Sequence, residues 1–187
     1  MLTNGNFEQD WSDESSHRCL VFPGAHERDV GNVFTPSGWC TWFRHEPGDW
    51  DQPEVRDAWA ENDARRVHEG RKATLLFTFF RKHDAGFLQQ VQVPPGARLG
   101  LSAWAHAWSN TNFDHEDDPH WSEGAGTDVV AWPAGSQPVT GEQQQDAKSN
   151  FTFWVGLDPT GGTDPFAETV VWGQGWHVYN GYGNLTA

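Results

Sequence analysis

The sequence predicts an all-β fold, an antiparallel β-sandwich of about eight to ten strands with at most one or two short helical turns. Its 187 residues include 12 Trp and 12 Phe beside 20 Gly and 11 Pro. This mixture of strand-favouring aromatics and turn formers is typical of short strands joined by loops. Apolar residues also recur with period two, and no helical segments alternate with these runs. A chain of this length is expected to form a single domain over residues 1–187.

The expected strands are the short apolar runs that Gly, Pro, Asn or Asp residues bound. In chain order they cover residues 18–22, 38–43, 73–80, 86–93, 98–108, 127–132, 150–157, 168–173 and 183–187. Residues 54–70 are the helical candidate, because Ala58, Trp59 and Ala60 stand there among many charges and the segment ends at Gly70.

The connections between these runs are also predicted from turn chemistry. Pro94, Pro95 and Gly96 predict a turn, and therefore a hairpin that joins residues 87–93 to residues 99–107. The long polar segments 110–128 and 133–149 are expected to be surface loops.

The charge of the chain restricts its partners. There are 26 acidic and 12 basic residues, and a net charge of -14 repels both phosphate backbones and anionic membranes. We therefore expect no nucleic-acid or membrane partner. The N-terminus lacks the basic and apolar regions of a signal peptide. We expect a location at the cell surface or outside the cell, so the protein is either exported by a signal that is not visible here or a module of a longer secreted chain. Cys19 and Cys40 either form one bridge or are two small buried hydrophobes.

Residues 100–110 pose the main question about function. In a strand, Leu101, Ala103, Ala105 and Ala107 line one face, and the other face carries Ser102, Trp104, His106 and Trp108. The first face suits a core. The second face combines indoles with an imidazole, and such rings need partners for their nitrogens when they are buried.

Faces that mix Trp with polar side chains suit sugar recognition, because a pyranose stacks its C–H groups on an indole and its hydroxyls need polar partners at the rim. The candidate platforms are Trp42, Trp104, Trp108 and Trp154. The candidate hydrogen-bonding partners are Arg44, Gln90, His106 and Asp158. The alternative is that these indoles form a second core.

Enzymatic chemistry has less support in the sequence. None of the expected strands carries the paired carboxylates that a glycosidase needs, and no hydrolase, zinc-protease or phosphate-loop motif is present. We therefore expect no catalytic residues. Two alternatives stay open: a structural or protein-interaction domain of a surface or virion protein, and a glycan-cleaving jelly-roll enzyme.

Two polar clusters in the sequence are candidates for a metal site or an acid–base site. Residues 114–118 with Asn110 and Asn112 offer oxygens to calcium, and His115 and His120 would suit zinc, but a solvated acidic loop is the simpler interpretation. His83 beside Asp84 is either an imidazole oriented by a carboxylate or part of a turn.

Four motifs in order resemble a known family. They are "LTNGNFE" at 2–8, "TPSGW" at 35–39, "VHEGRKATLLF" at 67–77 and "FLQQVQVPPGARLGLSAWAHA" at 87–107. Together they resemble carbohydrate-binding modules of families four, nine and twenty-two, which share the galactose-binding-like jelly roll. The resemblance covers residues 2 to about 110. Residues 155–173 resemble uncharacterised sandwich domains of bacterial surface or exported proteins.

The resemblance implies a non-catalytic module that binds a polysaccharide or oligosaccharide, such as a β-glucan or xylan, by Trp stacking in a concave cleft. Such a module is often appended to a larger secreted enzyme. The resemblance also implies a structural calcium ion, for which it selects Glu8, the backbone of Arg71 and Asn184. The acid that usually completes this set is missing, and Asn184 stands near its place.

Overall fold

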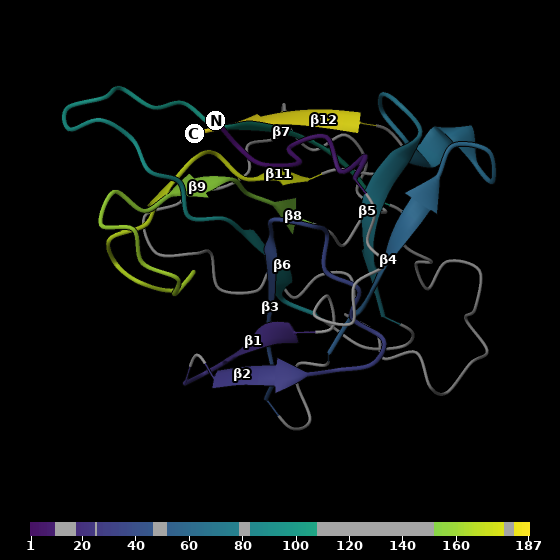
Figure 1. The fold of residues 1–187 in the computed structure, drawn as a ribbon, viewed down its shortest axis with the longest axis horizontal. Coiled ribbons are helices and arrows are strands. Elements are labelled where there is room, and N and C mark those ends of the chain that lie inside the picture. The colour runs from purple at the N-terminus through teal and green to yellow at the C-terminus, as the bar shows by residue number, and fades with distance from the viewer. Residues whose placement is uncertain (10–17, 25, 47–51, 79–82, 108–151, 178–181) are drawn as a thin grey trace. The chain divides into compact units, whose positions relative to one another are not determined.

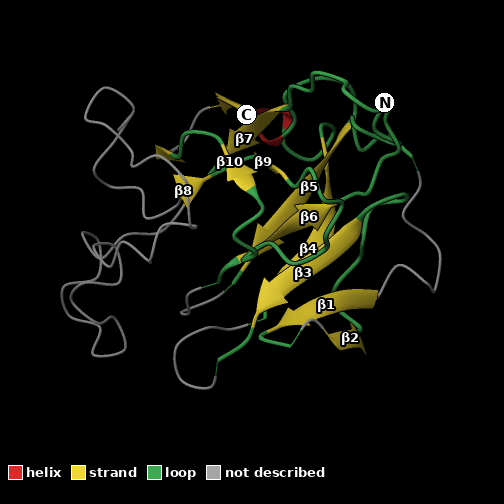
Figure 2. Ribbon diagram, turned by 90° about the vertical axis from the view of Figure 1, so that its left-hand side faces the viewer, coloured by secondary structure: helices red, strands yellow, loops and turns green. Residues whose placement is uncertain are grey.

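The computed structural model describes residues 1–9, 18–24, 26–46, 52–78, 83–107, 152–177 and 182–187. They belong to two compact units, residues 1–91 and residues 92–187. The described elements are strands β1 to β12 and one 3-10 turn, η2 (Ala64–Arg66), which is drawn red in Figure 2. The predicted all-β class is therefore confirmed (Figure 1), whereas the single domain and the jelly-roll topology stay predictions. Within the described part of the chain, no helix has the length and apolar character needed to cross a membrane.

The larger sheet of the first unit has four strands in the order β2-β1-β3-β6. Its strands are β1 (Arg18–Phe22), β2 (His26–Asp29), β3 (Cys40–Arg44) and β6 (Ala85–Leu88). The outer strand β2 carries the exposed charges of Glu27 and Arg28, which is a common way to keep a sheet edge from pairing with another chain.

One pairing in this sheet departs from the antiparallel prediction. Strand β1 runs antiparallel to β2 but parallel to β3. Parallel neighbours need a crossover of a dozen or more residues, and residues 23–39 supply one: they form β2 and then pass Val33, which bridges to Val55 of another sheet, before β3 begins.

The second sheet of this unit pairs β4 (Glu54–Trp59) with β5 (Lys72–Phe77) in antiparallel register. Both sheets contribute to one core. Cys19, Val21 and Phe43 come from the four-stranded sheet and pack with Val33 and Val55, all at most 2 % exposed. Two sheets around a shared apolar core are the arrangement of a β-sandwich.

The one or two helical turns predicted within residues 54–70 are confined to the second half of the segment. Residues 54–59 are strand β4, in which Val55 is 0 % exposed and the neighbouring Arg56 is exposed. Pairing with β5 satisfies the backbone of this strand. Among the described residues of this segment, the helical turn appears at η2, where the Asp63 side chain accepts a hydrogen bond from the Arg65 backbone N–H.

The segment compared with a first strand, residues 2–8, is a turn. Asn4 and Phe7 have φ angles of 49° and 59°, which lie in the left-handed region that a strand does not use. Asn4 is 6 % exposed and ties the turn down: its side chain donates to the Ser37 carbonyl over 3.1 Å and accepts from the Gln9 N–H. Tertiary hydrogen bonds therefore outweigh the local strand pattern.

The second unit is built from three antiparallel strand pairs. They are β7 (Ser102–His106) with β12 (Tyr182–Thr186), β8 (Thr152–Phe153) with β11 (Trp176–His177), and β9 (Gly156–Leu157) with β10 (Val171–Trp172). The register shifts by one residue between the last two pairs, so 152–157 and 171–177 form one ribbon with a β-bulge at 173–175.

The predicted hairpin between residues 87–93 and 99–107 does not form. The turn itself is present: the Ala97 N–H donates to the Pro94 carbonyl over 3.1 Å, and Gly96 has φ +76°. However, β6 pairs with β3 and β7 pairs with β12. The two proline residues remove donors from the intervening segment, and each flanking strand satisfies its backbone with another partner.

Cys19 and Cys40 are both free, so the disulfide does not form; Cys19 is buried, as the second interpretation has it, whereas Cys40 is half-buried. Cys19 lies opposite Thr41 in the register of β1 and β3, and both of these side chains are buried. Cys40 precedes Thr41 in the same strand and therefore points to the other face of the sheet. Burial also raises the pKa of the Cys40 thiol.

Candidate functional site

The pair β7–β12 has one buried and one exposed face, as the alternation in residues 102–106 predicts. Ala103 and Ala105 lie opposite Leu185 and Gly183 in the register, and both partners are buried, Leu185 with 1 % exposed. On the other face Trp104 is 52 % exposed. Among the tryptophans that the structure describes, Trp104 is the one in the exposed class.

The exposed face consists of three cross-strand pairs, which we call the strip. The strip comprises Ser102 opposite Thr186, Trp104 opposite Asn184, and His106 opposite Tyr182. The rings of His106 and Tyr182 are in contact, with centroids 5.2 Å apart and an interplanar angle of 49°. Burial raises the pKa of the Tyr182 phenol, so it remains a neutral hydroxyl at physiological pH.

The chemistry of the strip is neutral and amphipathic. It combines a half-exposed indole with two hydroxyls, a phenol, an amide and an imidazole, and none of its six positions is Asp, Glu, Lys or Arg. Such a surface can stack on an apolar ring face and exchange hydrogen bonds at the rim of that ring.

Backbone contacts hold the strip in register. The ladder continues beyond Ser102, because Leu101 and Ala187 exchange N–H···O bonds of 3.0 and 2.9 Å. Gly173, next to β10, approaches the end of β12 closely: a Cβ at Gly173 would lie 2.9 Å from the Thr186 carbonyl carbon, and closer still to its oxygen. A slip of one residue would turn the strip toward the interior, so these contacts maintain the exposed face.

Two of the predicted platforms pack on glycine instead. Trp42 lies opposite Gly86 in the register of β3 and β6 and is 8 % exposed. A Cβ at Gly86 would lie 3.0 Å from the Trp42 indole, and one at Gly175 would lie 2.7 Å from Cε2 of Trp154. An aromatic ring that covers a glycine of a neighbouring strand stabilises a sheet. We therefore leave Trp42 and Trp154 out of the candidate site.

Arg44 and Gln90, two of the predicted hydrogen-bonding partners, lie in the first unit. Arg44 ends β3 and is paired with Glu46, with Nε and Nη2 at 2.7 and 2.6 Å from Oε1. Gln90 is an exposed residue beyond the end of β6. Its neighbour Gln89 is structural: it accepts from the Thr3 N–H over 2.7 Å and donates to the carbonyls of Thr3 and Gly38.

Asp158, another predicted partner, organises a loop. Its Oδ1 accepts hydrogen bonds from the N–H and the hydroxyl of Thr160 at 2.9 and 2.7 Å, and its Oδ2 accepts from the Gly162 N–H at 3.1 Å. These bonds, first of all that from the Thr160 hydroxyl, lower the pKa of Asp158. A carboxylate with these partners nucleates the turn after β9.

The residues selected for calcium are partly together. Glu8 Oε1 accepts hydrogen bonds from the N–H groups of Arg71 and Lys72 at 2.7 and 2.9 Å, and these bonds lower the pKa of Glu8. Asn184 lies in the second unit, opposite Trp104. Calcium needs six to eight oxygen ligands, whereas two N–H donors point at this carboxylate oxygen. Among the described residues there is no group of three or more His, Cys, Asp or Glu side chains suited to a metal, and the calcium ion stays a prediction.

A cluster of partly buried titratable side chains lies where β3 and β6 meet. The Arg44 N–H donates to the Asp84 carbonyl over 2.8 Å. Burial raises the pKa of Asp84 to about 6, with Arg44 opposing and Glu46 adding to the shift. Burial lowers the pKa of His83 to about 4, and His83 Nδ1 lies 3.0 Å from the Thr78 hydroxyl. The hydrogen bond described for His83 is therefore with Thr78.

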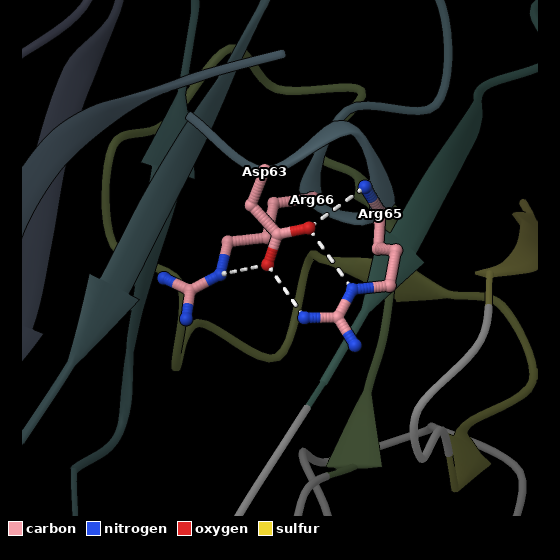
Figure 3. Close-up of polar contacts among 3 residues, drawn as sticks. All are labelled: Asp63, Arg65 and Arg66. Atoms are coloured by element: carbon pink, nitrogen blue, oxygen red, sulfur yellow. Dashed lines mark hydrogen bonds and ion pairs between the residues drawn. The ribbon is translucent and has the colours of Figure 1, made fainter. Parts of the chain in front are cut away.

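Figure 3 shows a second group of charged side chains, which lies in the loop between β4 and β5. Asp63 accepts from the backbone N–H of Arg65 at 3.1 Å and from its guanidinium at 3.0 Å, and lies 3.4 Å from Nε of Arg66. The side-chain hydrogen bond from Arg65 is the main reason that the pKa of Asp63 is lowered to about 2. Exposed pairs of this kind add little stability, so we assign Asp63 to capping η2.

Several predicted sites lie outside the described residues. They are Trp108, the acidic segment 114–118 with Asn110 and Asn112, and His115 and His120. Two members of the strip, Tyr182 and Thr186, were not predicted. The signal for them is the alternation of Tyr182, Asn184 and Thr186 near the C-terminus, which places all three on one face of a strand.

Comparison with known proteins finds no match to this chain among family models, curated proteins or solved structures.

Proposed function

We propose that this chain is a non-catalytic glycan-binding module, and that the strip on β7 and β12 holds the ligand. The observation that carries the proposal is the exposure of Trp104, 52 %, on a face whose other side chains are neutral hydrogen-bonding groups. An exposed indole among such groups matches the two needs of a sugar ring, an apolar platform and partners for its hydroxyls. The ligand class is a polysaccharide such as a β-glucan or xylan, bound outside the cell, with the module part of a larger secreted protein.

Four other described tryptophans support this choice of site by contrast. Trp42 and Trp154 pack over glycines, the Trp39 indole N–H donates to the Asn4 carbonyl over 3.0 Å, and that of Trp59 donates to Asp57 over 2.7 Å. These indoles have structural partners that account for their positions. Trp104 is 52 % exposed, so a large part of its surface is accessible to a ligand.

Affinity electrophoresis on native gels tests the proposal. We expect one or more neutral polysaccharides in a panel of β-glucans, xylans and mannans to retard the wild-type chain. Trp104→Ala should weaken binding at least about tenfold, because truncated aromatic anchors commonly cost 2 kcal/mol or more. The control Phe166→Ala removes another exposed aromatic, 41 % exposed, outside the strip, and should leave retardation unchanged. Unchanged mobility of the wild type on every polysaccharide would contradict the proposal.

Two further measurements separate the alternatives. A stable oligomer in size-exclusion chromatography that disappears in Trp104→Ala would favour a protein-interaction domain. Release of reducing ends from a retained polysaccharide would favour a glycan-cleaving enzyme, for which Asp84 is the first residue to test because its pKa is raised to about 6.

A further inference from the structure

The strip offers aromatic contacts at two successive positions along the strand axis. Trp104 is the first, and the touching rings of His106 and Tyr182 are the second. Residues two apart on one face of a strand are separated by about 7 Å. This spacing is comparable with the length of one pyranose unit in a linear chain, so neighbouring sugar units can meet the two positions in turn.

The polar groups follow the same axis. Asn184 accompanies Trp104, and the hydroxyls of Ser102 and Thr186 lie on the far side of Trp104 from the ring pair. From Ser102 to His106 the strip measures about 13 Å along β7, whereas the two strands are only about 5 Å apart. The surface is therefore elongated in the strand direction, and a ligand that uses all six positions extends along β7.

Resting on the proposed function, we propose that the strip binds a linear oligosaccharide parallel to β7, with roughly three consecutive sugar units in contact. One unit stacks on Trp104 and hydrogen-bonds to Asn184. This unit is the middle one of the three. The unit on one side of it lies on the ring pair of His106 and Tyr182, and the unit on the other side lies at Ser102 and Thr186.

Calorimetric titration of the full chain with cello-, xylo- and manno-oligosaccharides of one to six units tests this inference. In at least one series, affinity should rise at least about tenfold from one unit to three, because one added unit meets the ring pair and the other meets the hydroxyls of Ser102 and Thr186. It should then change little from three units to six. Affinity that is flat from the first unit, or that still rises tenfold beyond the third, would overturn the inference.

Variants at the second ring position make the test specific. Tyr182→Ala should remove most of the gain from added units, whereas Trp104→Ala should weaken binding at every length. Tyr182→Phe keeps the ring and should keep the gain, which separates the contact from a folding defect. Equal length dependence in Tyr182→Ala and wild type would overturn the inference. Retardation by a polysaccharide without a gain in any series overturns this inference alone, and failure of every glycan to bind overturns the proposed function as well.

Discussion

Replacing Gly173 by alanine is expected to destabilise the second unit and disturb the strip. A Cβ at this position would lie 2.9 Å from the Thr186 carbonyl carbon and 3.2 Å from the Ala187 Cα, with the Thr186 oxygen closer than either. All three atoms belong to the backbone of β12 or its last neighbour, so no side-chain rotation relieves the overlap. Overpacking of this kind costs about 1–3 kcal/mol, and we expect the upper end here.

Thermal unfolding followed by circular dichroism measures the effect. A loss of about 3 kcal/mol corresponds to a fall in Tm of roughly 6–12 °C for a chain of this size. Gly100→Ala is the matched control, because the nearest atom to its Cβ is the Ala187 oxygen at an ordinary 3.9 Å. Gly173→Ala should also bind more weakly to any polysaccharide that retards the wild-type chain in the native gel. Equal Tm values for Gly173→Ala and Gly100→Ala would refute the close approach of residue 173 to β12.

Two further predictions concern the first unit. Trp42→Ala should lower the free energy of unfolding by about 3–5 kcal/mol, because Trp42 is 8 % exposed and covers Gly86; urea denaturation measures this loss, and a loss under about 1 kcal/mol would contradict the packing role. Burial raises the pKa of Asp84 from 3.8 to about 6. The protonated carboxyl therefore stabilises the folded state fully below its unfolded pKa, and this stabilisation is lost as pH rises through about 6. Asp84→Asn should therefore gain stability relative to wild type between pH 4 and pH 6 in the same assay, and a constant difference would contradict burial of the carboxyl.

The strand positions with alternating burial could be predicted from the sequence. Leu185 and the alanines of β7 face inward while Trp104 faces solvent, because side-chain direction in a strand depends only on position along it. Residues 54–59 show no such alternation, because both Val55 and Ala58 are buried. The clustered charges of this segment favour a helix in the sequence. Pairing of β4 with β5 buries Val55 and outweighs that local composition.

The role of each tryptophan could not be predicted from its own strand. Trp42, Trp154 and Trp104 all have polar or small residues two positions before and after them, on the same face of the strand. What distinguishes their roles is the residue that lies across the sheet. Gly86 lies opposite Trp42 and leaves space that the indole fills, whereas Asn184 lies opposite Trp104. Cross-strand pairing depends on contacts distant in sequence, and these follow from topology rather than from local pattern.

Long-range hydrogen bonds also changed the roles of predicted partners. Asp158 is occupied by Thr160 and Gly162 of its own loop, which its Asp-Pro step and the following glycines could have indicated. By contrast, the hydrogen bonds of Glu8 to the N–H groups of Arg71 and Lys72 join segments more than sixty positions apart. The resemblance to carbohydrate-binding modules predicts Glu8 and the backbone of Arg71 at one place, and the hydrogen bond between them confirms this proximity; the calcium ion stays a prediction.

Binding of polysaccharide by wild type and Trp104→Ala, compared side by side, tests the central claim most directly. The account predicts that at least one neutral glycan slows the wild-type chain in a native gel. It predicts that the variant, with an unchanged circular dichroism spectrum, migrates there as it does without glycan. Retardation of both proteins to the same extent would show that the exposed indole of β7 does not contribute to binding.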